Sequence, residues 1–236
     1  MKLIKKKLTV MLKRKNKIIL SPLQISLEMS RSLPFTLILL LILSCGDSGI
    51  EDPENGDLNK GFKTGDLQNE IEKEQKELEK LKILGYNKTY LSKGEMPNCY
   101  NFKPIYSNID NYLNVNVGGN TDVAIKVMNA SSNQCIRFVY INSNSSFKIK
   151  NIPEGIFYLK IAYGKDWYMK NENGKCIGQF TKNPIYEKGQ DLMDFNIQRT
   201  VNGKSIPYYD LELDIVASDY SNTFDTQNIT EDDFNN

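Results

Sequence analysis

Hydrophobic and polar residues alternate through residues 111–217, which is the pattern of β-strands that are buried on one face. The apolar positions are Leu113, Val115 and Val117; Val123, Ile125 and Val127; Ile136, Phe138 and Tyr140; Phe147 and Ile149; Phe157, Leu159, Ile161 and Tyr163; Phe195 and Ile197; and Tyr209, Leu211, Leu213 and Ile215. Each run is short and is bounded by Asn, Ser, Gly or Pro. The pattern predicts a mainly β fold, a single antiparallel β-sandwich of about seven strands.

A helical pattern precedes the strands. Residues 66–84 carry Asp66 as a candidate N-cap and Gly85 as a candidate left-handed stop, with a stripe formed by Leu67, Ile71, Leu78 and Leu81. Glu74 interrupts the stripe, so a coiled coil is disfavoured. We expect a spacer or a cover on the domain, followed by a connecting segment at 85–110. At the other end of the chain, residues 218–236 read as an acidic polar tail.

The strongest localisation signal lies upstream of the helical pattern. Arg31 precedes a run of nine residues, Phe35–Leu43, which is apolar apart from Thr36, and Ser44 and Cys45 follow this run. This order of basic, apolar and small residues is that of a secretory signal, and nine residues are too few to span a bilayer. Residues 29–44 are therefore predicted to be a signal peptide, and residues 45–65, rich in Gly, Asp, Glu and Asn, a flexible acidic tether.

With Cys at the cut, Ile42-Leu43-Ser44-Cys45 resembles the lipobox of bacterial lipoproteins. The resemblance implies that the Cys45 sulfur receives a diacylglycerol and that its amine, freed by cleavage, is acylated. Several chains make membrane attachment durable. The Ser-Cys-Gly start followed by acids is similar to lipoproteins of some Gram-negative bacteria, which implies the cell envelope, at the outer membrane, periplasmic or surface-exposed. A simple secretory signal with an incidental Cys is the alternative.

A second resemblance rests on Ser146–Gly164, where Asn151-Ile152-Pro153-Glu154-Gly155 joins two alternating runs. Pro153 fixes φ and Gly155 permits positive φ, which suits a tight reversal. The pattern resembles carboxypeptidase regulatory-like domains, whose fold is a transthyretin-like sandwich. The resemblance implies a non-catalytic stability, spacing or interaction module and identifies no catalytic residue.

Residues 1–28 hold eight basic residues and a single acid. We interpret them as an extension upstream of the true start or as a long basic region removed with the signal; a basic membrane-surface helix is the rival. Removal of residues 1–44 takes nine of the 30 basic residues and one of the 29 acids, leaving a net charge of about −7. An acidic protein without a basic stripe is a poor candidate for binding nucleic acid.

The types of reactive side chain in the sequence argue against catalysis. Histidine is absent, which removes His-based catalytic machinery and His-ligated metals, and we expect no metal site and no cofactor. Two of Cys99, Cys135 and Cys176 are predicted to form a disulfide, with the pair left open. The acids Asp210, Glu212 and Asp214 alternate with apolar residues, which places them on a solvated strand face.

The segment Ala162–Tyr168 contains the chain's one Trp in an expected turn. Aromatic side chains on a loop can stack on sugars or peptides, so Tyr163, Trp167 and Tyr168 are the candidate ligand contacts, against the alternative that they plug the sandwich. The sequence thus predicts a non-enzymatic, lipid-anchored envelope protein that binds or spaces an unknown protein or glycan. The alternative is a carbohydrate-active protein, either a glycan-binding module or a carboxylate-pair hydrolase.

Overall fold

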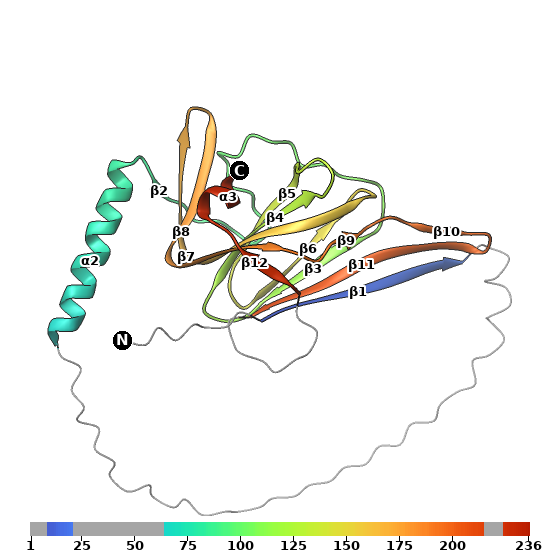
Figure 1. The fold of residues 1–236 in the computed structure, drawn as a ribbon, viewed down its shortest axis with the longest axis horizontal. Helices are drawn as coiled ribbons and strands as arrows, with labels where there is room; N and C mark the ends of the chain where they lie inside the picture. The colour runs from blue at the N-terminus through green and yellow to red at the C-terminus, as the bar shows by residue number, and fades with distance from the viewer. Residues whose placement is uncertain (1–8, 21–63, 215–223) are drawn as a thin grey trace, which may run out of the picture.

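The computed structural model describes residues 9–20, 64–214 and 224–236 (Figure 1). The strands are β1 (Thr9–Leu20), β2 (Asn87–Lys88), β3 (Tyr112–Val117), β4 (Asp122–Asn129), β5 (Cys135–Ile141), β6 (Ser145–Lys150), β7 (Ile156–Glu172), β8 (Lys175–Gly189), β9 (Met193–Asp194), β10 (Gln198–Thr200), β11 (Gly203–Asp214) and β12 (Thr226–Asn228). The helices are α2 (Thr64–Ile83) and α3 (Glu231–Asn235). The predicted signal peptide, Cys45 and most of the tether lie outside the described residues.

The strands form two sheets, as expected for a β-sandwich. One sheet has the order β1-β11-β3-β6, with β10 also paired to β11. The other has the order β12-β8-β7-β4-β5, with β2 and β9 paired to β7. Strand pairs are antiparallel apart from β3 and β11, which run parallel from Leu113 opposite Tyr209 to Val117 opposite Leu213. The prediction of a mainly β fold is confirmed, and the one parallel pair departs from a purely antiparallel sandwich.

The main core fills the space between the sheets. The alternating residues of β3 and β11 face those of β4, β5 and β7, and their side chains are almost fully buried: Leu113, Val115, Leu211, Leu213, Val123, Ile125, Val139, Ile141, Leu159 and Ile161. Each large aliphatic side chain buried in this way stabilises the fold by about 1.5–3 kcal/mol before chain entropy is counted. The period-two pattern therefore marks the inner faces of β3, β4, β7 and β11 correctly. In β5 it selects Phe138 and Tyr140, which lie on the outer face, whereas Val139 and Ile141 pack in the main core.

The outer face of the seven-stranded sheet is buried too, against the expectation of a solvated face. Its side chains, Ala124, Phe138, Tyr140, Ala162, Trp167 and Phe180, form a second cluster with Leu91 and Phe234. Leu91 comes from the segment expected to be a plain connection, and Phe234 from the stretch expected to be a polar tail. Both expectations are corrected: the connection and residues 224–236 pack on this face, because their few apolar residues cover it.

A register shift between β7 and β8 explains a further difference. The sequence suggested a turn at Ala162–Tyr168, but β7 continues to Glu172 and the hairpin turns at Asn173 and Gly174. The register with β8 shifts between Tyr163 and Lys165, next to Gly164 at φ +154°. At this point the single residue Gly164 of β7 lies opposite two residues of β8, Asn183 and Pro184, and the side chains of β7 change face. Tyr163 accordingly packs in the main core, whereas Trp167 packs in the second cluster.

Helix α2 lies at one end of the molecule beside β8 (Figure 1). Its C-terminus is closed by Gly85 at φ +84°, with the Tyr86 amide donating to the Leu81 carbonyl and the Gly85 amide to the Lys82 carbonyl. This is the predicted stop in a left-handed residue. Most of the helix is exposed, and Glu74 forms an ion pair with Lys182 of β8 at 2.8 Å.

Strand β1 is the unexpected element, because it comes from the region that the sequence marks for removal. All twelve residues of Thr9–Leu20 pair antiparallel with β11, from Thr9 opposite Asp214 to Leu20 opposite Gly203. Figure 1 shows β1 at the outer edge of its sheet. Any cleavage before Cys45 removes this strand and leaves the long edge of β11 unpaired.

Candidate functional site

The three aromatic residues expected to contact a ligand are buried. Tyr163, Trp167 and Tyr168 are 0%, 1% and 7% exposed. Tyr163 donates a hydrogen bond to Glu187 at 3.3 Å inside the fold. The ring of Trp167 packs edge-on against Phe180 at 4.8 Å between centroids. The prediction of an aromatic binding surface is wrong, because β7 changes face at its register shift against β8 and places Trp167 in the second cluster.

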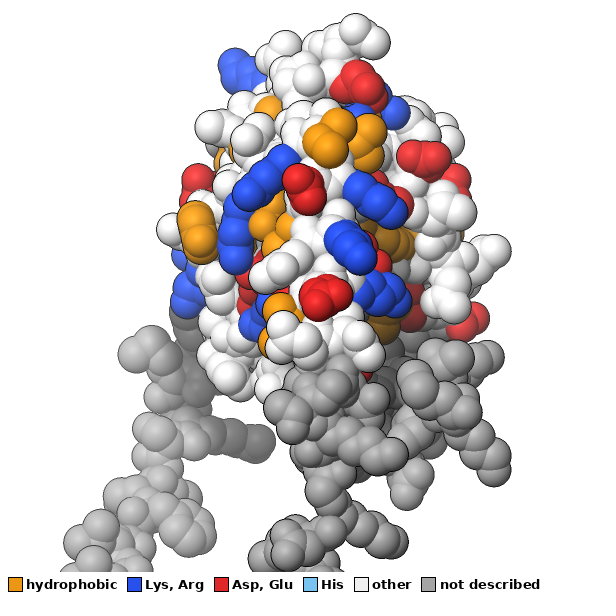
Figure 2. Space-filling model, turned by 90° about the vertical axis from the view of Figure 1, so that its left-hand side faces the viewer, with side chains coloured by type: hydrophobic (Ala, Val, Ile, Leu, Met, Phe, Trp, Pro, Cys, Tyr) orange, Lys and Arg blue, Asp and Glu red, His pale blue; other side chains and the backbone are white. Residues whose placement is uncertain are grey.

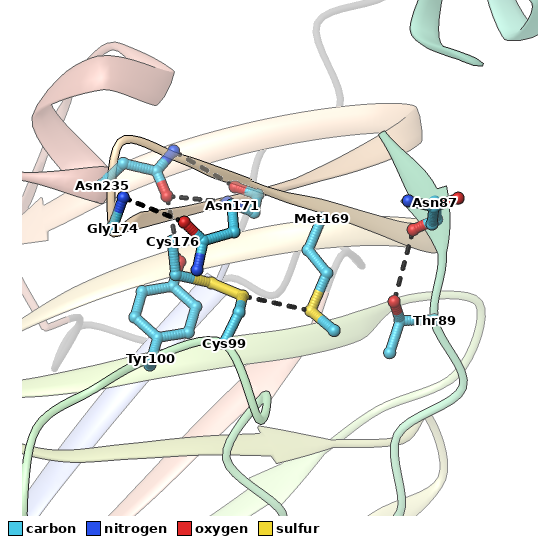
Figure 3. The surroundings of a disulfide bond; sticks show 10 residues. Asn87, Thr89, Cys99, Tyr100, Met169, Asn171, Gly174, Cys176 and Asn235 are labelled. Atoms are coloured by element: carbon cyan, nitrogen blue, oxygen red, sulfur yellow. Dashed lines mark hydrogen bonds between the residues drawn. A yellow bond between two sulfur atoms is a disulfide. The ribbon is translucent and has the colours of Figure 1, made fainter. Parts of the chain in front are cut away.

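The disulfide joins Cys99 to Cys176 and leaves Cys135 as the free thiol of the described residues. It ties the segment before β3 to β8, on the outer face of the seven-stranded sheet (Figure 3). Burial raises the pKa of the Cys135 thiol to about 11, so the thiolate, the reactive form, is suppressed at neutral pH.

Asn235 fixes the C-terminal helix beside this disulfide. Its side-chain oxygen accepts hydrogen bonds from the Gly178 amide and the Tyr100 hydroxyl, both at 3.0 Å, and its amide donates to the Gly178 carbonyl at 3.2 Å. Figure 3 shows Asn235 above Cys176 and Tyr100. A Cβ on Gly178 would lie 2.2 Å from the Trp167 ring, so glycine is required there. Helix α3 itself begins with a capping box between Thr230 and Asp233.

A buried lysine lies under the same helix. Lys126 of β4 is 5% exposed, and its ammonium donates to the Phe234 carbonyl at 2.8 Å. The rings of Phe234, Tyr100 and Phe138 lie 4.8, 5.0 and 5.5 Å from its nitrogen. Burial lowers the pKa of Lys126 to about 8. A small cavity of about 180 Å³ opens beside it, lined in part by Cys135 and Asn236. Cation–π contacts and the carbonyl hold the ammonium in place, and the arrangement locks the C-terminus onto the sheet.

The second polar site is a set of three acids that contact β1, namely Asp110, Asp194 and Asp210, which we call the acidic edge. Lys17 of β1 contacts Asp110 at 2.7 Å, and Lys15 contacts Asp210 at 2.6 Å. Arg14 lies 3.9 Å from Asp194. The Asn114 amide also donates to Asp210 at 3.1 Å. Partial burial raises the pKa of the Asp210 carboxyl, but the bonds from Lys15 and Asn114 outweigh it and hold that pKa below its ordinary value.

The acidic edge corrects one expectation about the alternating acids. Asp210 was expected on a freely solvated face, whereas it is paired with β1 and with Asn114. Glu212 is exposed, as alternation predicts. Sequence reasoning missed Asp110 and Asp194, since neither belongs to an acidic cluster. It missed Lys126 as well, although a lone Lys inside the apolar run Val123–Met128 is a signal of a buried amine.

An apolar groove of about 340 Å³ separates α2 from β8, with Leu78, Leu81 and Phe180 among its lining residues. Figure 2, which views the molecule from the side of α2, shows Lys and acidic side chains interspersed with apolar ones over this face. The mixture of charges provides no single-sign patch there.

Comparisons of the chain with protein-family models, with curated proteins and with solved structures give no match. Across residues 9–20, 64–214 and 224–236, no helix is long and apolar enough to cross a membrane. Within the same described ranges, no three Cys, Asp or Glu side chains gather closely enough to hold a metal ion. The narrower expectation of a transthyretin-like sandwich stays a prediction.

Proposed function

We propose that the protein is a lipid-anchored component of the cell envelope, attached through lipid on Cys45 at the outer membrane, and that its sandwich is a non-catalytic module that binds or spaces a partner. The observation that carries the proposal is the order Arg31, Phe35–Leu43, Ser44, Cys45. A basic residue, a short apolar run and a small residue before Cys are the arrangement in which the thiol is alkylated and the preceding peptide bond is cut.

Physical arguments support the anchor. An apolar run of nine residues spans less than half of a hydrocarbon core about 30 Å thick, so it serves as a signal rather than as a membrane span. Acyl chains contribute about 0.8 kcal/mol for each buried methylene, and two or more chains make attachment durable. The disulfide between Cys99 and Cys176 fits an oxidising compartment outside the cytoplasm.

The architecture of the domain supports a passive module rather than the carbohydrate-active alternative. The aromatic surface on which a sugar would stack is absent at Trp167, because that ring is packed in the second cluster. Asp210 accepts a hydrogen bond from the Asn114 amide of β3 at 3.1 Å, a contact that cleavage before Cys45 leaves in place. What the fold leaves for recognition is sheet edges and mixed-charge faces.

Metabolic labelling with a palmitate analogue in a Gram-negative host tests the anchor. The native chain is expected to take up label and to sediment with membranes, whereas Cys45→Ala loses both properties. Cys135→Ala is the matched control, because Cys135 is the other cysteine outside the disulfide and is expected to leave labelling unchanged. Equal labelling of the native chain and Cys45→Ala would refute the proposal.

A further inference from the structure

The β1–β11 pairing shows what the edge of β11 accepts. Twelve consecutive residues of β1 match β11 without a register break, from Thr9 to Leu20. On its other side, β11 pairs with β3 over only Tyr209–Leu213 and with β10 over Gly203–Ser205. The edge that β1 occupies is therefore the longest continuous pairing surface of this strand. Without β1, its amides and carbonyls are unpaired, which is a template for adding a strand.

The charges at this edge select the strand that binds. Three acids on different segments form ion pairs with basic residues along the one extended strand β1. The pairs are Arg14 with Asp194, Lys15 with Asp210 and Lys17 with Asp110. The side chains of Arg14, Lys15 and Lys17 remain exposed. Such pairs at a solvated rim contribute modest energy but fix register and exclude acidic strands.

From these observations we propose that the β11 edge is a β-augmentation site for an extended, basic segment of a partner protein. The inference rests on the proposed function, because cleavage before Cys45 is what removes β1 and opens the edge. In β-augmentation, main-chain hydrogen bonds supply affinity and side-chain contacts at alternate positions supply specificity. Here the backbone of Gly203–Asp214 supplies the main-chain hydrogen bonds, and the acidic edge supplies the side-chain contacts that give specificity.

A basic partner segment fits this edge better than a second copy of the chain. Self-pairing of β11 would bring Asp210 and Glu212 of one copy toward an edge that already carries these acids. A segment with Lys or Arg at the positions of Arg14, Lys15 and Lys17 neutralises the edge instead.

The test uses the chain in two states that differ only in whether β1 is tethered. A protease site is inserted between residues 44 and 45 of the Cys45→Ala full chain, and a fluorescent peptide with the sequence of residues 9–20 is added before and after the cut. We expect uptake of the peptide only after cleavage, together with slowed hydrogen exchange at the β11 amides. A scrambled peptide of equal composition is the peptide control.

The acidic edge has its own matched controls. Asp110→Asn with Asp210→Asn removes two edge charges and is expected to weaken peptide binding about tenfold, as expected for losing two rim ion pairs. Glu172→Gln with Asp232→Asn removes two exposed acids elsewhere and is expected to change it little. The native lipid-anchored chain, processed in the host, should bind the peptide as the cut chain does.

The outcomes separate this inference from the proposed function. If the cut chain keeps its circular dichroism and its disulfide but takes up no peptide, or instead dimerises, the β11 site is overturned. If the cut chain binds the peptide but the host never removes residues 1–44, the edge chemistry stands and the lipid anchor fails. Equal binding of the scrambled peptide would also overturn the proposal.

Discussion

The buried amine of Lys126 makes the stability of the domain depend on pH in a calculable way. Its pKa is about 8 in the folded chain and 10.5 when exposed. Between these values the unfolded chain binds more protons, so the free energy of unfolding rises as pH increases. A shift of this size corresponds to about 3 kcal/mol in total, of which about 1.3 kcal/mol appears between pH 7 and pH 9. The Phe234 carbonyl and the three ring faces stabilise the charged ammonium in the folded chain. The two free energies are therefore upper values for the effect of Lys126.

The assay is urea unfolding at pH 7 and at pH 9, followed by the fluorescence of Trp167, the chain's one Trp. Lys126→Met removes the titrating group at similar length. We expect the native chain to gain about 1 kcal/mol relative to Lys126→Met between the two pH values. The pKa of Cys135, raised from 9.0 to about 11, acts in the opposite direction, but only from about pH 9 upward, where the thiol of the unfolded chain titrates.

Lys93→Met is the matched control, because Lys93 is exposed. The native chain and Lys93→Met should keep a constant difference in unfolding free energy between pH 7 and pH 9. If the difference between the native chain and Lys126→Met is also constant, or falls with pH, the reasoning about the buried amine is refuted.

Three further predictions concern the packing of the outer face. Phe234→Ala is expected to lower the free energy of unfolding by about 3–4 kcal/mol in urea titrations, and a loss below 1 kcal/mol would show that α3 does not seal this face. Gly178→Ala is expected to cost about 1–3 kcal/mol through overpacking against the Trp ring, whereas Gly119→Ala, where a Cβ meets nothing closer than 3.5 Å, should cost less; equal losses would contradict the packing argument. Replacing Cys99 and Cys176 together by Ala opens a loop with a sequence separation of 77 and should cost roughly 4 kcal/mol, measured by thermal unfolding, and an unchanged melting temperature would rule the disulfide out as a stabilising link.

Much of the sandwich was accessible from sequence because its inner faces obey a two-residue period. In β3, Asn alternates with Leu113, Val115 and Val117, and in β11 acids alternate with Leu211 and Leu213. The sequence of each strand therefore indicates which face is buried. The helix before the sandwich was also predictable, since Gly85 ends it in a left-handed residue as expected, although the helix begins at Thr64, two residues before the predicted N-cap Asp66.

The outer face was not predictable in the same way. The alternation at Phe138 and Tyr140 indicates a buried face but not the residues that cover it. The covering residues, Leu91 and Phe234, lie far away in the chain. The burial of Trp167 depends on the register shift between β7 and β8 after Tyr163, which a period-two pattern does not reveal. Long-range pairing likewise decides which cysteines join.

The acidic edge illustrates the same limit. Asp110, Asp194 and Asp210 are separated by many residues, and the fold alone brings them beside one strand. The strand they contact, β1, comes from residues that composition marks as a removable leader. Whether β1 remains paired with β11 therefore depends on whether the chain is cut before Cys45.

Intact-mass analysis of the chain purified from membranes of a Gram-negative host answers that question most directly. The account predicts a mature chain that begins at Cys45, lacks residues 1–44 and carries the added mass of a diacylglycerol and an amide-linked acyl chain. A chain that retains Thr9–Leu20, or that begins near Cys45 without lipid, would contradict it.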